Sequence, residues 1–349
     1  MQQLSAPVRT RQPYLAGLDN LRGAAALAVC LFHLLAGALP ARTLVPAVAA
    51  VARHGHLGVP VFFVVSGFIV PYSLAHYRGV RQFGQFLGRR LLRLGPPAWA
   101  AMLLVVAEWL TEQALTGHAP AGLTQLGAGQ VLHNMLFTAP LAGYDGLLSV
   151  GWTLAVELQF YVLLGLLYPQ LFGRRRPLGW FVGVFAALGL LAAAAGPLAA
   201  RVGLLAQSPL FALGGLALLW QRGQLPRWAW LSGLAGFTAL GLWLQGEGVM
   251  LAGLLAVLAL VWPPRPLPGL RWLGRISYSL YLTHVPVGIA AEYGLHRLLH
   301  PDTAAGQLLV GLACVAAAVA GAAAFHRWVE QPCRVLAQTI FTARRTIRQ

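Results

Sequence analysis

Two ionisable residues, Arg22 and His33, stand within the first long apolar stretch of the chain, near residues 20–39. Ionisable side chains are costly inside a membrane, so those that occur there usually serve a function. At ~100° and ~1.5 Å per residue, the eleven steps from Arg22 to His33 return to within about 20° of the starting direction and cover roughly 16 Å. Both side chains therefore share one helix face. A fixed cation on the same face as a titratable imidazole indicates a site that binds an anion and moves a proton.

The composition is that of a membrane protein. The 349 residues are 58% hydrophobic and 10% charged, with a mean hydropathy of +0.67, whereas a soluble domain is about 25% charged. The net charge is +16, but all 25 basic residues are arginines spread between apolar runs. Binding of nucleic acid needs a basic face on a soluble fold, so we expect none. The three cysteines, Cys30, Cys314 and Cys333, predict neither a disulfide framework nor a metal site.

Runs of apolar residues long enough to cross a hydrocarbon core of ~30 Å predict the fold class, an all-α polytopic membrane helix bundle. About ten transmembrane helices are expected, near 20–39, 57–76, 95–115, 150–170, 178–196, 202–220, 228–245, 248–263, 274–296 and 306–328. The apolar segment 131–142 is too short to cross, and we expect it to be re-entrant or to lie at the interface.

The arginines predict the orientation, because cytoplasmic loops of membrane proteins retain positive charge. With ten spans and both termini in the cytoplasm, 21 of the 25 arginines fall on the cytoplasmic side. Only Arg42, Arg53, Arg201 and Arg297 then face outward. An error of one span would destroy this alternation, so the tally supports the whole arrangement.

The same topology brings polar residues of four helices to one depth, roughly 9–15 Å from a membrane surface at ~1.5 Å per residue. These residues are His33, Ser66, Glu157 and His284. Arginines ring the cytoplasmic edge, namely Arg22, Arg89, Arg90 and Arg93. Guanidinium groups match phosphate oxygens, and an imidazole suits general-base work on a hydroxyl. A ligand with phosphates at one end and a reactive carbonyl at the other would fit both levels, and coenzyme A thioesters have that form.

Several segments together resemble the acyltransferase 3 family of integral membrane O-acyltransferases. In the family's order they are Leu18-Asp19-Asn20-Leu21-Arg22-Gly23 followed by His33, then 58–68 (GVPVFFVVSGF), the Arg-x-x-Arg loop at 90–93, 152–161 (WTLAVELQFY), 277–284 (SYSLYLTH) and Glu330-Gln331-Pro332. The likeness covers about residues 15–335. It implies that 1–349 is a single acyltransferase 3 membrane domain with no appended soluble domain. The chain departs from many relatives at Pro60, where they have Asp, and at Leu158, where they have a second Glu.

The resemblance implies an O-acyltransferase of the bacterial inner membrane that moves an acetyl or similar group from acyl-CoA, here acetyl-CoA, to a hydroxyl of an envelope carbohydrate or glycolipid. No permanently bound cofactor and no metal are expected. The catalytic residues implied are His33, Arg22 and Glu157, while Arg89, Arg90 and Arg93 bind the donor. Residues implied to orient substrate or imidazole are Asp19, Ser66, Trp152, Tyr161, Tyr281 and His284.

Other interpretations fit the same residues. A lone His33 in a span is compatible with a simple hydrogen bond between helices, Arg22 with an ion pair to Asp19, and the Arg89 to Arg93 cluster with topology alone. A transporter or flippase for a glycolipid or small anion would also use polar residues at mid-membrane. No paired helix breaks are visible in two similar halves, which disfavours it. A scaffold without catalysis would tolerate changes at His33 and Glu157.

Overall fold

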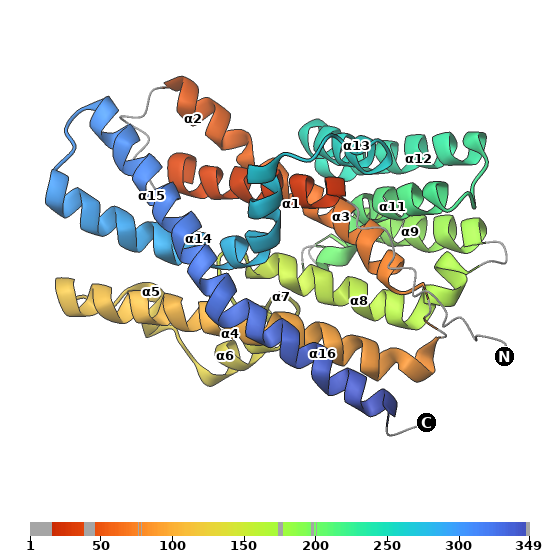
Figure 1. The fold of residues 1–349 in the computed structure, drawn as a ribbon, viewed down its shortest axis with the longest axis horizontal. Helices are drawn as coiled ribbons and strands as arrows, with labels where there is room; N and C mark the ends of the chain where they lie inside the picture. Colours follow the sequence, from red (N-terminus) through yellow and green to blue (C-terminus); the bar gives the residue numbers. More distant parts are fainter. Residues whose placement is uncertain are drawn as a thin grey trace, which may run out of the picture.

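The computed structural model describes residues 16–37, 46–75, 77, 79–173, 177–196, 199 and 201–346. All regular structure in these residues is helical, and the helices run roughly alongside one another (Figure 1). The all-α bundle predicted from the sequence is therefore confirmed.

Each of the ten predicted spans coincides with a helix. They are α1 (Ala16–Leu31) with the π-helical turn η1 (Phe32–Gly37), α3 (Gly58–Ser73), α4 (Phe83–Thr116), α8 (Gly151–Phe172), α9 (Pro177–Ala194), α11 (Gly203–Gln221), α12 (Arg227–Gln245), α13 (Glu247–Val261), α14 (Pro268–Leu299) and α15 (Ala304–Phe325). Shorter elements are α2 (Pro46–Arg53), η2 (His54–Leu57), η3 (Val80–Gln82), α5 (Ala121–Thr124), α6 (Ala128–Met135) and α7 (Ala139–Ala142). After α15 come the π-helical turn η4 (His326–Glu330) and α16 (Gln331–Thr346).

Six helical stretches of the described chain are long and apolar enough to cross a membrane. They are Gly17–Ala36, Ala47–Ser73, Val80–Thr116, Gly151–Phe172, Gly203–Gln221 and Ala304–Ile340. Two shorter apolar helices, Leu178–Ala194 and Glu247–Val261, match further predicted spans. Large apolar side chains stand on the outside of the bundle, including Trp180, Leu251 and Leu309 at 60–67% exposure. Such a surface needs acyl chains rather than water around it, so the chain is a multi-pass membrane protein, while ten crossings stay a prediction.

One helix boundary differs from the sequence-based expectation. Helix α4 begins at Phe83 rather than near residue 95, so Arg89, Arg90 and Arg93 stand on a helix and not in a loop. An apolar run marks only the part of a helix within the hydrocarbon, whereas Arg, Leu and Gln continue a helix readily in the aqueous region. The segment 131–142 is not one helix, because α6 ends at Met135 and α7 begins at Ala139.

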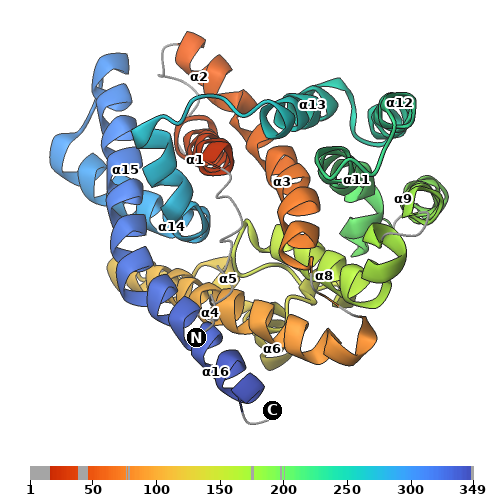
Figure 2. The same cartoon turned by 45° about the vertical axis from the view of Figure 1, so that its right-hand side comes forward.

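Glycines set how closely α1 packs against its neighbours. Figure 2 shows α1 between α14 and α3. A Cβ atom at Gly23 would lie 2.1 Å from the Leu270 carbonyl oxygen, and one at Gly274 would lie 2.0 Å from that of Asp19. Only glycine permits this approach of two backbones, as at other helix contacts in membranes. The pair therefore fixes α1 against α14 close to the residues of interest.

The largest cluster of buried side chains lies on the other side of α3. Helix α11 is almost wholly buried, and it meets α3 where Gly214 faces the Val64 carbonyl oxygen. Phe160 of α8 stacks on Phe211 of α11 with ring centroids 4.1 Å apart. Helix α11 thus packs closely against one face of α3 and of α8, and the opposite faces of these two helices line the interior.

Arginines from distant parts of the sequence gather at one end of the bundle, which we call the arginine end. Arg22 lies in the second turn of α1, Arg90 and Arg93 lie in the first turns of α4, and all three line one cavity. Arg334 of α16 lies with the α4 arginines around a second cavity. Some arginines of the charge tally lie outside the described residues, namely 9, 11, 42, 78, 174–176 and 348. The alternation of helices expected from the charge tally stays a prediction.

Candidate active site

His33 and His284 contact each other directly. His33 stands in η1, the π-helical turn that ends α1, and π-helical turns frequently occur at functional sites. Its Nδ1 lies 3.0 Å from Nε2 of His284 on α14. His284 is 1% exposed, so this histidine pair is shielded from bulk solvent on the α14 side.

The backbone partners of the pair assign the ring protons. Nδ1 of His284 lies 2.9 Å from the Leu280 carbonyl oxygen, and Nδ1 of His33 lies 3.0 Å from that of Val29. A carbonyl oxygen only accepts, so both Nδ1 atoms carry hydrogen in the neutral rings. The single hydrogen on His33 Nδ1 is then shared between two acceptors, the Val29 carbonyl oxygen and His284 Nε2. This arrangement leaves Nε2 of His33 with a free lone pair, the form that a general base requires.

Glu157 has partners other than the histidines. Ser66 Oγ donates to its carboxylate at 3.3 Å, and the hydroxyl of Tyr161, one helical turn further along α8, donates to the same oxygen. The guanidinium carbon of Arg90 lies 5.2 Å from the Tyr161 ring centroid. The side chain that is hydrogen-bonded to the His33 imidazole is His284, one of the residues that the sequence implies to orient substrate or imidazole.

An inner cavity of about 200 Å³ runs into the bundle from the arginine end. Its polar lining comes from α1, α3, α4, α8 and α14, and consists of Arg22, Ser66, Ser73, Arg90, Arg93, Thr153, Glu157, Tyr161, Ser277, Tyr278 and Tyr281. Most of the predicted site residues therefore share one cavity. Among the described residues, no carboxylate lies within ion-pair distance of Arg22, so the proposed pairing with Asp19 is absent. The guanidinium instead contributes positive charge to the cavity wall.

His33 lies beyond the cavity rather than on its wall. Phe62 and Tyr281 line the cavity and contact each other, with ring centroids 5.6 Å apart. The Tyr281 ring is 6.2 Å from that of His284, and its hydroxyl is hydrogen-bonded to Thr153 Oγ1 at 2.9 Å. Tyr281 thus contacts both the inner cavity and His284, and we call the two contacting rings of Phe62 and Tyr281 the aromatic partition.

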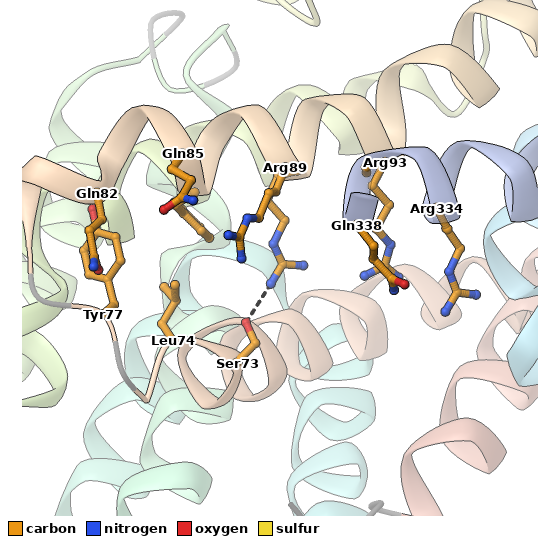
Figure 3. Close-up of a pocket in the computed structure, with 12 residues that line it drawn as sticks. Ser73, Leu74, Tyr77, Gln82, Gln85, Arg89, Arg93, Arg334 and Gln338 are labelled. Carbon is orange, nitrogen blue, oxygen red and sulfur yellow. Dashed lines mark hydrogen bonds between the residues drawn. The ribbon is translucent and has the colours of Figure 1, made fainter. Parts of the chain in front are cut away.

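A wider cleft of about 570 Å³ opens at the arginine end, and it shares Ser73, Arg90 and Arg93 with the inner cavity. Arg90 donates to Ser73 Oγ at 2.7 Å, the contact drawn as a dashed line in Figure 3. The other lining residues are Leu74, Tyr77, Gln82, Gln85, Phe86, Arg89, Arg334, Ala337 and Gln338. We call this space the arginine cleft. Four arginines and no acidic residue line it, so it can bind a multiply charged anion.

Trp152 belongs to a third cavity, of about 260 Å³, on the opposite side of the first turn of α8. Its ring is 43% exposed and meets Phe63 at a centroid distance of 6.1 Å. Asp145 and Ser149 lie in the same wall, whereas Thr153 and Leu154 face the inner cavity. A single helical turn thus separates the two spaces.

Asp19 and Asn20, both buried, serve the start of α1 instead of a cavity. The Asn20 side chain donates to the Arg265 carbonyl at 3.1 Å and accepts from the Leu267 N–H at 3.3 Å. Sequence reasoning missed this amide, whose only signal was its place beside Arg22. Among the described residues, no group of three or more His, Cys, Asp or Glu side chains is placed to hold a metal ion.

The helical bundle, the histidine pair and the arginine-lined cavities define a membrane enzyme of an acyl-transferring class. A family model described as an acyltransferase domain matches residues 15–327. The chain therefore belongs to the acyltransferase 3 family, and it is an acyltransferase for groups other than amino-acyl groups.

Named relatives agree with that assignment. A membrane-bound transacylase, BcsY of Komagataeibacter xylinus, is 30% identical over 320 residues, which cover 83% of this chain and 77% of the relative. The exopolysaccharide production protein ExoZ of Rhizobium meliloti is 30% identical over 269 residues, 69% of this chain and 79% of ExoZ. The O-acetyltransferase OatA of Staphylococcus aureus is 29% identical over 177 residues, 47% of this chain and 26% of OatA. No solved structure is significantly similar.

Proposed function

We propose that this acyltransferase takes an acyl group, such as acetyl, from acyl-CoA at the arginine end and transfers it to a hydroxyl of a carbohydrate or glycolipid of the bacterial envelope. The observation that carries the proposal is that the arginine cleft and the inner cavity share Ser73, Arg90 and Arg93, while Tyr281 of the inner cavity contacts the ring of His284. In the proposed orientation the arginine end faces the cytoplasm across the inner membrane, because positively charged segments are retained there.

The two connected spaces suit the two ends of the donor. Phosphates would bind in the arginine cleft, where guanidinium groups offer paired donors without a competing carboxylate. The uncharged arm that carries the thioester would extend past Arg90 and Arg93, which line both spaces. Its acyl end would then reach Tyr281. Movement of the Tyr281 ring, at the cost of one hydrogen bond to Thr153, would open the aromatic partition toward His33.

His33 would act through Nε2. In direct transfer, Nε2 removes the proton of the acceptor hydroxyl as its oxygen attacks the thioester carbonyl, and the imidazolium returns that proton to the departing CoA thiolate. Alternatively, Nε2 attacks the thioester carbonyl and expels CoA as its thiolate, and the acceptor hydroxyl then takes the acyl group from the imidazole while its proton passes to the thiolate. His284 assists either route, because its Nε2 accepts a hydrogen bond from the ring that becomes charged. We assign Glu157 to the cavity wall beside Ser66, where it would orient the arm or the acceptor.

The cavity at Trp152 is the proposed approach for the acceptor. An exposed indole beside a carboxylate and a hydroxyl offers an apolar face and hydrogen bonds, which sugars use together. Two relatives bear names that concern exopolysaccharide production and O-acetyl transfer, which supports a carbohydrate acceptor here.

The experiment is a donor-cleavage assay on purified protein in lipid nanodiscs, with acetyl-CoA as donor and free CoA thiol as the readout. We expect thiol release in the wild type and a loss of at least about 100-fold in His33→Ala, the scale for removal of a general base. His118→Ala, in an exposed loop, is the matched control. Full activity of folded His33→Ala would refute the catalytic role, and transport without cleavage would favour a transporter. Mass spectrometry of envelope polysaccharides from a deletion strain would identify the acceptor.

A further inference from the structure

Helix α16, after the last predicted span, forms one wall of the arginine cleft. It crosses α4 near the beginning of that helix (Figures 1 and 2). Arg334 and Gln338 of α16 and Arg89 and Arg93 of α4 extend toward the same space (Figure 3). The cleft is therefore built from segments more than two hundred residues apart in the sequence.

A buried carboxylate orients Arg334. One Nη atom of Arg334 lies 3.8 Å from a carboxylate oxygen of Glu330, which is 2% exposed. The other oxygen of Glu330 accepts from Ser279 Oγ at 2.7 Å and lies 2.9 Å from His326 Nδ1. Because three side chains hold this carboxylate between α14 and η4, it is a rigid support. The guanidinium keeps further N–H donors for a ligand, since one guanidinium has five.

The charge of the cleft needs an anionic ligand. Arg334 adds a fourth guanidinium to the three on α4, and the remaining polar lining is neutral. Glu330 faces the interior. In the ion pairs of the described residues, Arg334 is the one arginine of these four that Glu330 contacts. Like charges drawn together in a partly enclosed space repel, and a bound phosphate group relieves the repulsion.

We propose that Arg334, assisted by Gln338, binds a phosphate of the nucleotide end of the donor, so that α16 completes the donor site. This inference rests on the proposed use of acyl-CoA. Of the four arginines that line the cleft, Arg90 and Arg93 also line the inner cavity, whereas Arg334 lines the arginine cleft alone. The thioester arm leads inward, and the phosphates farthest from it would reach α16.

The test measures the dissociation constants of three ligands for the protein in zwitterionic nanodiscs, namely CoA, 3′-dephospho-CoA and pantetheine. Arg334→Ala and Arg334→Gln are compared with the wild type, and Arg327→Ala, exposed and outside both cavities, is the matched control. Arg334→Gln retains a polar side chain and serves if the alanine variant fails to fold. We expect CoA affinity to fall at least about tenfold in the Arg334 variants, the scale for one hydrogen bond to a charged group, and pantetheine binding to stay unchanged.

Each outcome decides the question. A loss for CoA with none for 3′-dephospho-CoA would support contact with the 3′-phosphate, and an equal loss for both would support contact with the diphosphate. Unchanged CoA affinity in the Arg334 variants would overturn the inference, and weaker retention of anionic lipid in the same variants would assign Arg334 to a lipid headgroup. If the wild type binds no CoA, the proposed donor itself is wrong, which is a different result from unchanged binding in a variant.

Discussion

Replacement of His284 tests whether the histidine pair works as a unit. When His33 takes up a proton, its Nδ1–H keeps the contact of 3.0 Å with His284 Nε2, which then becomes a hydrogen bond to a charged donor. Bonds of that kind contribute about 1.5–3 kcal/mol. At about 1.36 kcal/mol per tenfold change in rate, His284→Phe should lower kcat roughly 10- to 150-fold. The loss should be smaller than in His33→Ala, because Val29 still holds Nδ1–H of His33.

A matched variant separates the hydrogen bond from packing. His284→Gln places a side-chain oxygen near the position of Nε2, so it can accept from His33 and should retain activity within a few-fold of the wild type. The measurement is kcat and the KM for acetyl-CoA from thiol release, with thermal unfolding to confirm that both variants fold. Unchanged KM is expected, since His284 lines neither cavity of the proposed donor path. Equal loss in the Phe and Gln variants, or full activity of His284→Phe, would refute the reasoning.

Two further predictions concern the helix contact and the donor path. Gly274→Val should destabilise the fold by about 1–3 kcal/mol or more, because its Cβ would meet the Asp19 carbonyl oxygen at 2.0 Å. Thermal unfolding should show a lower Tm for this variant than for the control Gly294→Val, which lies on the same helix with no atom in the way. Equal Tm values for the two variants would contradict the prediction. Arg93→Ala should raise the KM for acetyl-CoA by roughly tenfold or more with little change in kcat, because Arg93 lines both the arginine cleft and the inner cavity. An unchanged KM would mean that Arg93 serves only to orient the protein in the membrane.

The sequence predicted the helices and most of the cavity wall, but not the contacts across it. Apolar runs located the spans, and the shared cavity of Arg22, Arg93 and Glu157 follows from their predicted levels. The partnership of His33 with His284 spans 251 residues and depends on how closely Gly23 and Gly274 let two helices approach. No spacing along one chain segment encodes that distance.

The role of α16 was equally hidden in the sequence. Arg334 follows the last apolar run, where a basic residue ordinarily marks only topology. The proposed role of Arg334 depends on the packing of α16 against α4 and on the contact of Arg334 with Glu330. The sequence showed Glu330 as part of a motif but did not show which residue it contacts. The start of α4 was wrong for a related reason, because hydropathy does not report helix that extends beyond the hydrocarbon.

The aromatic partition has an electrical consequence. If the inner cavity is filled from the cytoplasm and the acceptor approaches from the other face, then Phe62 and Tyr281 lie at the thinnest part of the barrier between the two sides of the membrane. Each elementary charge that crosses a membrane dissipates about 2.3 kcal/mol per 100 mV. Such an enzyme must let an uncharged acyl group pass while it blocks protons and ions, and two contacting rings joined to Thr153 by one hydrogen bond suit that task. The cell's membrane voltage, and not only the reaction rate, would then constrain the residues at these positions.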